Sequence, residues 1–506
     1  MHRADSVDCV IGVDIGTQGV RGMAVASDGT VVAHASVPWP SGTLRTGPDG
    51  AFEQDAEQWW RATCSVLSQI GEQLTGAGVA SDTVKALCVA GTSGTFVPLD
   101  SSYRPLRPAL MYSDSRAVAE AHRCNSVLSN LTAKLGYRFN ASFALPKLLW
   151  LSENEPEVWA RTALIAHQVD YIVGRLTGVW GVSDYTNALK LGYDLLAERY
   201  PPEIASDFGL SLECLPQIVP PGTPLGRLVP SVADALGLSQ RTLVVAGLTD
   251  GCASQFAAGA TEPGEWVSSL GTTLIIKGVS SELVKDLQGR IYCHRHPEHG
   301  WLPGGASNTG SKVLAHHFPD ADLAAYDTRA AALVPTSLLA YPLVGHGERF
   351  PFVVPDAEGF LVSESNGEQL QPDLVYSAFL EGVALLERLA YEVVAELGAP
   401  VIGPIRSVGG GARSQLWLRI RSSVCNRPFI VPEVADTAVG AAILAAAGRL
   451  HPDLKSATQA MVPNSKEIIP DPNWVPVYEE RHARFKDELR ARGYLMTITL
   501  WEGGNV

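Results

Sequence analysis

Residues 9–32 read CVIGVDIGTQGVRGMAVASDGTVV, and the fold prediction starts from this stretch. The apolar runs 9–15 and 20–26 predict two strands joined at a glycine-flanked turn, and Asp28-Gly29 is a hairpin signal before a third strand. A similar pattern recurs at residues 266–277, WVSSLGTTLIIK, where a Gly-Thr-Thr turn separates two apolar runs. One such hairpin near the start of each half suggests two related domains that face each other.

Between the two hairpins, short apolar strands alternate with amphipathic helices, which is typical of an α/β protein. One helix is predicted over residues 373–397, with Asp373 as its N-cap and Gly398 as its stop. Pro-rich stretches within residues 201–224 place a domain boundary near residue 240, so we predict domains 1–242 and 243–506.

The composition is that of a folded protein with a small substrate. The 506 residues allow roughly two to four domains, and 46% hydrophobic with 18% charged residues is a globular balance. A net charge of −14 gives no support for nucleic acid or anionic membranes as partners. The eight cysteines form no C-x-x-C, and we find no secretory signal or membrane span, so a cytoplasmic location is expected.

Asp14 precedes the first turn, at the end of a strand too apolar to favour a carboxylate. Such a charge requires hydration, a partner or a metal, so a solvated strand end and a metal or phosphate role both stay open. Gly16 and Gly19 allow backbone N–H groups to point into one concavity, and Thr17 adds a hydroxyl. This turn is therefore either a phosphate cradle or simply a tight hairpin.

Asp250 follows a second strand signal, the unalternating apolar run 243–246. Such a strand is expected to be covered on both faces, and in open α/β sheets ligands bind at the carboxyl edge. A carboxylate there could accept a proton from an attacking hydroxyl, with Gly251 permitting close approach of a ligand. The alternative is that Asp250 caps the helix predicted over residues 252–258.

Three further segments bear on ligand binding. The turn at residues 271–273 can cradle phosphates like the first turn, and Gly409-Gly410-Gly411 between a strand and a helix would admit a flat ring or a sugar. A small-residue helix at residues 437–447 would either pack beneath that loop or simply pack against other helices. A Walker A motif is missing, which disfavours a P-loop enzyme. Residues 293–299, CHRHPEH, invite a metal interpretation, but we expect a surface or hairpin loop.

Together these motifs resemble, in order and over nearly the whole chain, those of the FGGY carbohydrate kinases. They are DIGT at 14–17, GLTDG at 247–251, LGTT at 270–273, and GGGARS at 409–414 with Trp417. The resemblance implies an α/β fold of two actin-, Hsp70- and hexokinase-type domains, which are ribonuclease H-like, with a cleft for Mg-ATP and a sugar.

The resemblance also implies roles for individual residues. Asp250 becomes the base that deprotonates the terminal sugar hydroxyl, and Asp14 and Asp250 become the carboxylates at the Mg²⁺ site. The residues implied to bind ATP are Gly16, Thr17, Gln18, Gly271, Thr272, Thr273, Gly409, Gly410, Gly411, Ala412 and Ser414.

The loop 91–95, GTSGT, helps to predict the substrate. It lacks the Arg-Glu pair of glycerol kinases and the Gln-Met-His of bacterial xylulokinases. That loop, the strand pair 270–277 and the segments 292–295 and 304–310 resemble those of the xylulokinase-like D-ribulose kinases of plants and cyanobacteria. The resemblance makes D-ribulose the first expectation and D-xylulose the second. The residues then expected near the sugar are Ser93, Gly94, Thr95, Tyr112 and Asp114. For Asp114, a structural salt bridge with Arg116 is an equal alternative.

Two questions about the protein as a whole stay open. A nucleotide-driven protein of the Hsp70 or actin kind, without a sugar, would share the implied fold. The sequence also leaves a homodimer open.

Overall fold

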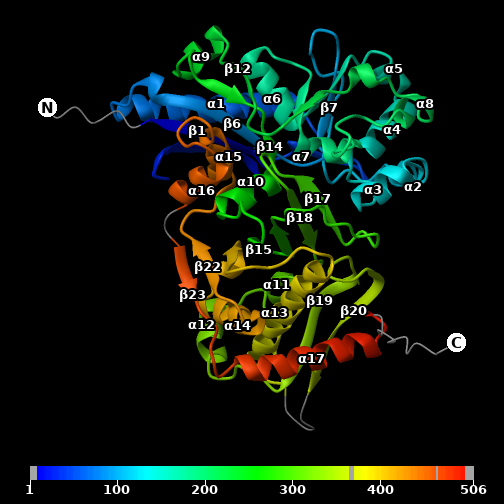
Figure 1. The fold of residues 1–506 in the computed structure, drawn as a ribbon, viewed down its shortest axis with the longest axis vertical. Helices are drawn as coiled ribbons and strands as arrows, with labels where there is room; N and C mark the ends of the chain where they lie inside the picture. Colours follow the sequence, from blue (N-terminus) through cyan, green and yellow to red (C-terminus); the bar gives the residue numbers. More distant parts are fainter. Residues whose placement is uncertain (1–7, 364–369, 463–464, 496–506) are drawn as a thin grey trace.

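The computed structural model describes residues 8–363, 370–462 and 465–495, and it contains two seven-stranded sheets, one in each half of the chain (Figure 1). The first sheet has the order β12-β13-β6-β1-β2-β3, with β14 paired to β6. Its strands are β1 (Cys9–Ile15), β2 (Gly19–Ala26), β3 (Val31–Pro38), β6 (Val84–Gly91), β12 (Pro224–Arg227), β13 (Leu243–Val245) and β14 (Leu248–Thr249).

The second sheet has the order β17-β18-β16-β15-β21-β22-β23. Its strands are β15 (Trp266–Leu270), β16 (Leu274–Gly278), β17 (Ile291–Arg295), β18 (Trp301–Ala306), β21 (Ile405–Val408), β22 (Phe429–Pro432) and β23 (Ser465–Ile468). In both sheets the first strand runs antiparallel to the next strand in the chain and parallel to a later one, β6 or β21. Both predicted hairpins and their structural repeat are therefore confirmed.

Smaller strands and the helices surround these sheets. The remaining strands are β4 (Leu44–Thr46), β5 (Phe52–Gln54), β7 (Phe96–Leu99), β8 (Ala109–Leu110), β9 (Leu164–His167), β10 (Val182–Asp184), β11 (Gln217–Val219), β19 (Leu338–Glu348) and β20 (Val354–Ser363). The helices of the first half are α1 (Ala56–Gly76), α2 (Val118–Val127), α3 (Ser129–Leu135), α4 (Ala144–Asn154), α5 (Pro156–Trp159), α6 (Gln168–Thr177), α7 (Tyr185–Ala188), α8 (Glu203–Ser206) and α9 (Pro230–Leu236). The later helices are α10 (Asp250–Ala257), α11 (Lys312–His317), α12 (Leu323–Ala330), α13 (Pro372–Glu396), α14 (Gln415–Cys425), α15 (Thr437–Ala446), α16 (Leu454–Met461) and α17 (Val475–Ala491).

The predicted long helix is confirmed as α13, although its first cap differs from the prediction. Gln371 occupies the N-cap, and Asp373 lies in the first turn, where its carboxylate accepts from Arg329 Nε at 2.9 Å. Because Pro372 already occupies the first helical position, the helix begins one residue earlier than the sequence indicates. Gly398 follows the helix with φ +96°, as expected of a residue that ends a helix.

The boundary predicted at residue 242 is followed directly by strands of the first sheet. Both β13 and β14 pair in parallel with β6. Only after α10 does the chain enter β15 of the second sheet. We therefore propose that the N-terminal domain extends through α10 and that the division falls between residues 258 and 265.

Helices α10 and α15 lie between the two sheets (Figure 1) and pack closely at glycines. A β-carbon added at Gly12 of β1 would lie 1.8 Å from the carbonyl oxygen of Ala438, and one at Gly440 would lie 1.8 Å from that of Ala253. The small residues of α15 thus bring it against β1 and α10, which agrees with the helix-packing alternative rather than with packing beneath the glycine loop.

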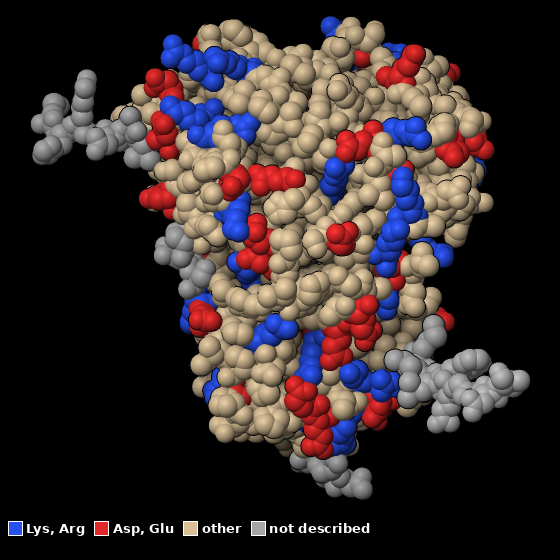
Figure 2. All heavy atoms as spheres, viewed as in Figure 1, with Lys and Arg blue, Asp and Glu red and all other residues tan. Residues whose placement is uncertain are grey.

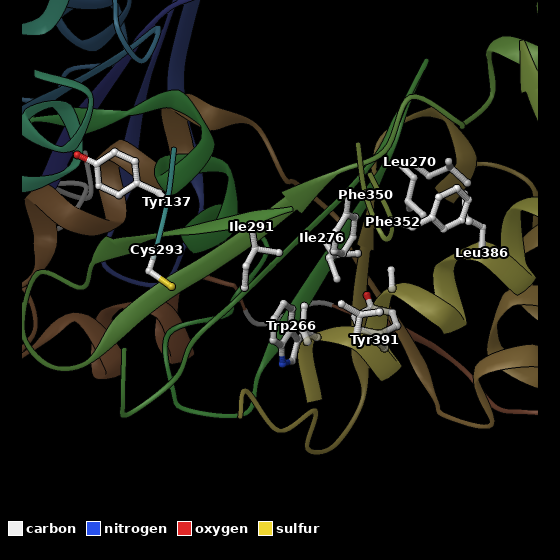
Figure 3. Packing of buried hydrophobic residues seen from close by; sticks show 14 of the residues in the cluster. Tyr137, Trp266, Leu270, Ile276, Ile291, Cys293, Phe350, Phe352, Leu386 and Tyr391 are labelled. Carbon is white, nitrogen blue, oxygen red and sulfur yellow. The ribbon is translucent and has the colours of Figure 1, made fainter. Parts of the chain in front are cut away.

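The largest apolar core runs through both halves of the molecule. Trp266 of the second sheet meets Tyr391 of α13 edge-on, with ring centroids 6.0 Å apart. The same cluster continues along β17 through Ile291 and Cys293 towards Tyr137 of the first half (Figure 3). The β17–β18 hairpin is therefore anchored to both halves, which fixes one wall of the region between them.

On the face shown in Figure 2, Lys and Arg side chains are interspersed with Asp and Glu. This mixture is consistent with the expectation that the protein presents no broad basic field there. Among the described residues, no helix combines the length and apolar character required to cross a bilayer.

Candidate active site

Three parallel strands end at the same level and bring the predicted acids to one edge of the first sheet. Ile15 of β1 pairs with Gly91 of β6, and Thr249 of β14 pairs with the same Gly91. Asp14 and Asp250, which neighbour Ile15 and Thr249 in sequence, are therefore carried to one place with the loop that follows Gly91. This is the carboxyl edge where α/β sheets bind ligands.

The Asp14 carboxylate is buried and only partly satisfied. Its Oδ2 accepts from Arg21 Nη2 at 2.7 Å, while its Oδ1 is buried without a hydrogen-bond partner. Burial raises the pKa of Asp14 to about 6; Arg21 opposes this change, and the nearby carboxylates of Asp250 and Asp436 reinforce it. Arg21 also reaches Asp436, with Nη1 3.3 Å from Oδ2. Two acids, Asp14 and Asp436, therefore share the Arg21 guanidinium, and Asp250 acts electrostatically on Asp14.

A cavity of about 390 Å³ opens beside Asp14, and the β1–β2 turn forms its wall. The predicted residues Gly16, Thr17 and Gln18 all line it, together with Arg21, Asp250 and Thr437. The Gly16 N–H is used within the turn, where it donates to the Gly19 carbonyl oxygen at 3.0 Å. Arg21 and the remaining polar groups of the turn can therefore meet an anion.

A second cavity, of about 540 Å³, lies on the other side of Asp250. The predicted residues Ser93 and Tyr112 line it, together with Lys190, Lys277, Tyr292 and His294. Ser93 Oγ and His294 Nδ1 are buried there without hydrogen-bond partners, so both can serve a polar ligand. Burial lowers the pKa of His294 well below its usual range, which keeps this imidazole neutral. Asp250 is thus shared by the two cavities.

Asp250 is the first residue of α10, and Thr249 occupies the N-cap position. This differs from the alternative in which Asp250 caps the helix. The N–H of Thr249 donates to Thr186 Oγ1 at 2.9 Å, and Asp250 Oδ1 accepts from the Gly251 N–H at 2.6 Å. Burial raises the pKa of Asp250, while the Gly251 N–H and the ammonium groups of Lys277 and Lys190 oppose that change. A carboxylate so placed suits a general base.

Gly94 and Thr95, two residues predicted to contact the sugar, instead form hydrogen bonds that stabilise the loop carrying Ser93. Thr95 Oγ1 lies 2.7 Å from Thr92 Oγ1 and accepts from the Tyr112 N–H at 3.0 Å. Gly94 has φ +88°, and its carbonyl oxygen accepts from the buried Lys147 Nζ at 2.7 Å. These contacts favour a supporting role for Gly94 and Thr95, one step away from a ligand.

Asp114 forms the salt bridge that the sequence leaves open. Its buried carboxylate accepts from Arg116 Nη2 at 2.7 Å and from the Phe52 N–H at 2.9 Å. Arg116 Nη2 also donates to Glu53 at 2.6 Å. With its oxygens engaged in this way, Asp114 is better explained as a structural group than as a sugar ligand.

The second turn and the glycine loop meet each other in the second sheet. A β-carbon at Gly409 would lie 2.7 Å from the Leu270 carbonyl oxygen, and one at Gly411 would lie 2.5 Å from Leu270 Cδ2. By contrast, β-carbons at Gly271 and Gly410 would meet nothing within 4 Å. Packing therefore explains Gly409 and Gly411, whereas Gly271 and Gly410 leave open space that a ligand could use.

The other predicted nucleotide residues lie around the same two segments. Thr272 and Thr273 complete the β15–β16 turn, where the Gly271 N–H donates to the Thr273 carbonyl oxygen at 3.1 Å. Ala412 ends the short helical turn η4 (Gly410–Ala412). Ser414 is the N-cap of α14, and its Oγ accepts from the Trp417 N–H at 3.0 Å. The Ser414 hydroxyl therefore has a structural use.

Several side chains of the cavities were not predicted from the sequence. Arg21 stands opposite Asp14 in the β1–β2 register, so the predicted hairpin contained the signal that could have found it. His294 belongs to the segment expected to be a surface or hairpin loop. Residues 296–299 do form the turn of the β17–β18 hairpin, but His294 itself lies in β17 and is only 2% exposed. The sequence around Lys190 and Lys277 contains no motif that would have marked either lysine as a residue of the site.

The acids of the first cavity fit a hydrated Mg²⁺ ion. Among the described residues, no group of three or more His, Cys, Asp or Glu side chains is arranged to enclose a metal. Mg²⁺ nevertheless requires only one or two carboxylates, because water and phosphate oxygens supply its other ligands. The unpartnered Asp14 Oδ1 beside Asp250 is a donor of that kind.

Two sheets of one topology, with an acid shared by two cavities at the edge of the first sheet, define a two-domain ribonuclease H-like enzyme of the actin and hexokinase type. The predicted fold class is confirmed by similar solved structures. The xylulose kinase of Rhodospirillum rubrum is 28% identical, with a TM-score of 0.83 over 96% of this chain and 99% of that one.

The chain belongs to the FGGY family of carbohydrate kinases. The N-terminal domain of that family matches residues 9–257, and the C-terminal domain matches residues 266–449. A xylulose kinase of Streptomyces coelicolor is 32% identical over 447 residues, which cover 86% of this chain and 87% of that protein. A xylulose kinase of Bacillus subtilis is 27% identical over 448 residues, covering 87% and 88%.

Family membership makes the chain a phosphotransferase that uses ATP and a carbohydrate acceptor. The alternative of a non-kinase protein of the Hsp70 or actin kind is therefore not supported.

Proposed function

We propose that this kinase transfers the γ-phosphoryl group of ATP to the terminal hydroxyl of a ketopentose, D-ribulose first and D-xylulose second. The observation that carries the proposal is the position of Asp250, which lines both the cavity of the β1–β2 turn and the cavity of Ser93 and Tyr112. A base at that junction can touch an acceptor on one side while the donor phosphate lies on the other.

In the proposed reaction, the sugar hydroxyl gives its proton to Asp250 as its oxygen bonds to the γ-phosphorus. The bond from that phosphorus to the β–γ bridging oxygen breaks, and ADP leaves with the electron pair. The first turn and Arg21 hold the phosphates, and Gly271 and Gly410 leave room for the rest of the nucleotide. Asp14 and Asp250 would hold Mg²⁺, which when bound neutralises phosphate charge.

The choice of sugar rests on the second cavity. Ser93 presents a buried, unpartnered hydroxyl in the loop where bacterial xylulokinases carry Gln-Met-His. A neutral His294 and Tyr112 add further hydrogen-bonding groups for a polyhydroxylated substrate. The relatives named xylulose kinase support D-xylulose as the second candidate. We also propose a cytoplasmic location.

The test is a coupled ADP-release assay over D-ribulose, D-xylulose, L-ribulose, glycerol and gluconate, with Mg²⁺ and ATP. We expect D-ribulose to give the highest kcat/KM. A response that is equal across the panel, or highest for glycerol, would refute the ketopentose assignment.

The role of Asp250 is tested with Asp250→Asn, and Asp234→Asn on the exposed face of α9 serves as the matched control. The Asp250 variant should lose about 10²- to 10⁴-fold in kcat while still binding ATP, because a general base typically contributes that much. If it retains more than about a tenth of wild-type turnover, Asp250 is not the base.

A further inference from the structure

Lys277 approaches the catalytic acid Asp250 from the opposite domain. Gly251 and Gly304, which have no side chains, leave room for it. Lys277 lies on β16, and a β-carbon added at Gly251, next to Asp250, would lie 2.7 Å from its Nζ. A β-carbon at Gly304 of β18 would lie 3.0 Å from its Cγ. The sequence assigns Gly251 to the approach of a ligand, but the group that approaches it closely is this lysine.

Lys190 faces the same acid from the N-terminal domain. It lies in the short turn η2 (Leu189–Leu191) and is 8% exposed. Its Nζ donates to the Ser93 carbonyl oxygen at 3.3 Å and lies over the rings of Phe143 and Tyr292, 5.4 and 5.9 Å from their centroids. Asp250 is thus bracketed by one lysine from each domain.

Neither lysine has a carboxylate partner within the described part of the chain. Lys277 Nζ is 3.9 Å from Cys252 Sγ, a weak acceptor, and Lys190 bonds only a carbonyl oxygen and aromatic faces. Lys190 is buried, Lys277 is half-buried, and both ammonium groups act on the Asp250 carboxylate. Two ammonium groups beside one carboxylate leave a positive charge unmatched, and an anion in the cavity would neutralise it.

The second cavity as a whole is lined mainly by positively charged residues, like the two lysines. Its cationic lining residues are Arg138, Lys190, Lys277, Arg290 and Arg349, and among the described lining residues Asp250 is the sole acid. Of these cations, Arg290 is neutralised by Asp286, with Nε 2.9 Å from Oδ2. A neutral sugar alone would leave this excess of positive charge unmatched.

We propose that Lys277 and Lys190 form an anion subsite beside Asp250 that holds the phosphoryl group on the sugar side once it has been transferred. The proposal rests on the proposed function, because it requires the acceptor hydroxyl to lie at Asp250. Lys277 Nζ lies close to Gly251, the residue next to the acid, and it comes from the domain that does not carry the acceptor loop. It therefore acts on the phosphoryl group as a binding residue.

The experiment compares binding of D-ribulose 5-phosphate and of D-ribulose by titration calorimetry, without nucleotide. The test variant is Lys277→Met, and Lys277→Arg keeps the charge. Lys285→Met is the matched control, since Lys285 is exposed and does not line the cavity. Gly251→Ala keeps the lysine but displaces its ammonium group.

Lys277→Met should weaken binding of the sugar phosphate by about tenfold to a hundredfold, the usual effect of losing a hydrogen bond to a charged group. Binding of D-ribulose should change less than threefold. Lys277→Arg should recover most of the loss, Gly251→Ala should reproduce part of it, and Lys285→Met should match the wild type. An equal loss for both ligands, or no loss for the phosphate, overturns the proposal.

Two further arms separate this proposal from the proposed function. Inorganic phosphate should bind the wild type and lose affinity in Lys277→Met even if no ketose in the panel is phosphorylated. If Lys277→Met instead abolishes phosphorylation of gluconate while leaving binding of the sugar phosphate intact, the subsite serves a substrate carboxylate, and the phosphoryl assignment is wrong. Should Lys277→Met fail to fold, Lys277→Arg and Gly251→Ala decide between these outcomes.

Discussion

Replacing Asp14 by Asn is predicted to stabilise the free protein at neutral and alkaline pH while it removes activity. The carboxylate is held in a buried position with one oxygen unpartnered and with Asp250 and Asp436 nearby. Asparagine keeps the shape and removes the charge. Arg21 retains Asp436 at 3.3 Å, so its guanidinium keeps a carboxylate partner.

The size of the predicted stabilisation follows from the pKa of Asp14, which burial raises to about 6. Against about 3.9 in an unfolded chain, this difference corresponds to about 3 kcal/mol. Because the folded pKa is the higher one, the folded state binds the proton more tightly, and stability is lost as pH rises from about 4 through 6. The wild type carries the full penalty at pH 8, and the asparagine variant does not.

Thermal unfolding without nucleotide measures this effect at pH 5 and pH 8. At pH 8 the melting temperature of the variant should be about 6 °C above that of the wild type, since 1 kcal/mol corresponds to about 2 °C in a domain of this size. At pH 5 the increase in melting temperature should be about half as large. Asp234→Asn, at an exposed position, should change neither midpoint. The reasoning is refuted if Asp14→Asn melts at or below the wild type at pH 8, or if its gain is the same at both pH values.

The effect of Mg²⁺ on stability and turnover gives an independent test of the same variant. Because Asp14 is proposed to hold the metal, MgATP should raise the wild-type midpoint more than that of Asp14→Asn, and the variant should require more Mg²⁺ for any remaining turnover. An unchanged metal requirement would exclude Asp14 from the metal site.

Two further changes test the packing that positions the site. Gly440→Ala should destabilise the protein by about 3 kcal/mol or more, because its β-carbon would lie 1.8 Å from the Ala253 carbonyl oxygen, while Gly76→Ala, with nothing within 4 Å, should not. Melting temperatures measure both, and equal midpoints would contradict the close helix packing. Asp114→Asn should cost about 1–3 kcal/mol of stability, because one acceptor oxygen is lost while Arg116 keeps Glu53 as a partner, and the KM for the sugar should stay within a few-fold of the wild type. A tenfold rise in KM at unchanged stability would instead return Asp114 to the sugar site.

The hairpins and the position of the acids could be predicted from the sequence because both are local properties. The turn at residues 16–19 joins strands adjacent in sequence, and its glycines mark it directly. Asp250 follows a strand that is apolar on both faces, and this pattern alone places it at a carboxyl edge of the sheet. Even Arg21 was within reach, since hairpin register alone pairs it with Asp14.

The lysines and His294 could not be predicted because their neighbours lie far away in sequence. Lys190 and Lys277 act on one acid from different domains, and each looks like an ordinary polar residue within its own segment. The two alternatives for Asp114 stayed open for a related reason, since its hydrogen bond to the Phe52 N–H joins segments that only folding brings together.

Strand periodicity and turn residues act over a few positions, so the amino-acid sequence was sufficient to predict the α/β class and the repeated hairpin. Folding in three dimensions settled which groups surround the second cavity, which glycines are required by packing, and that a single carboxylate is shared by two cavities. Those properties depend on the register of β1, β6 and β14 and on the approach of the second sheet, and long-range contacts of this kind leave no periodic trace in the chain.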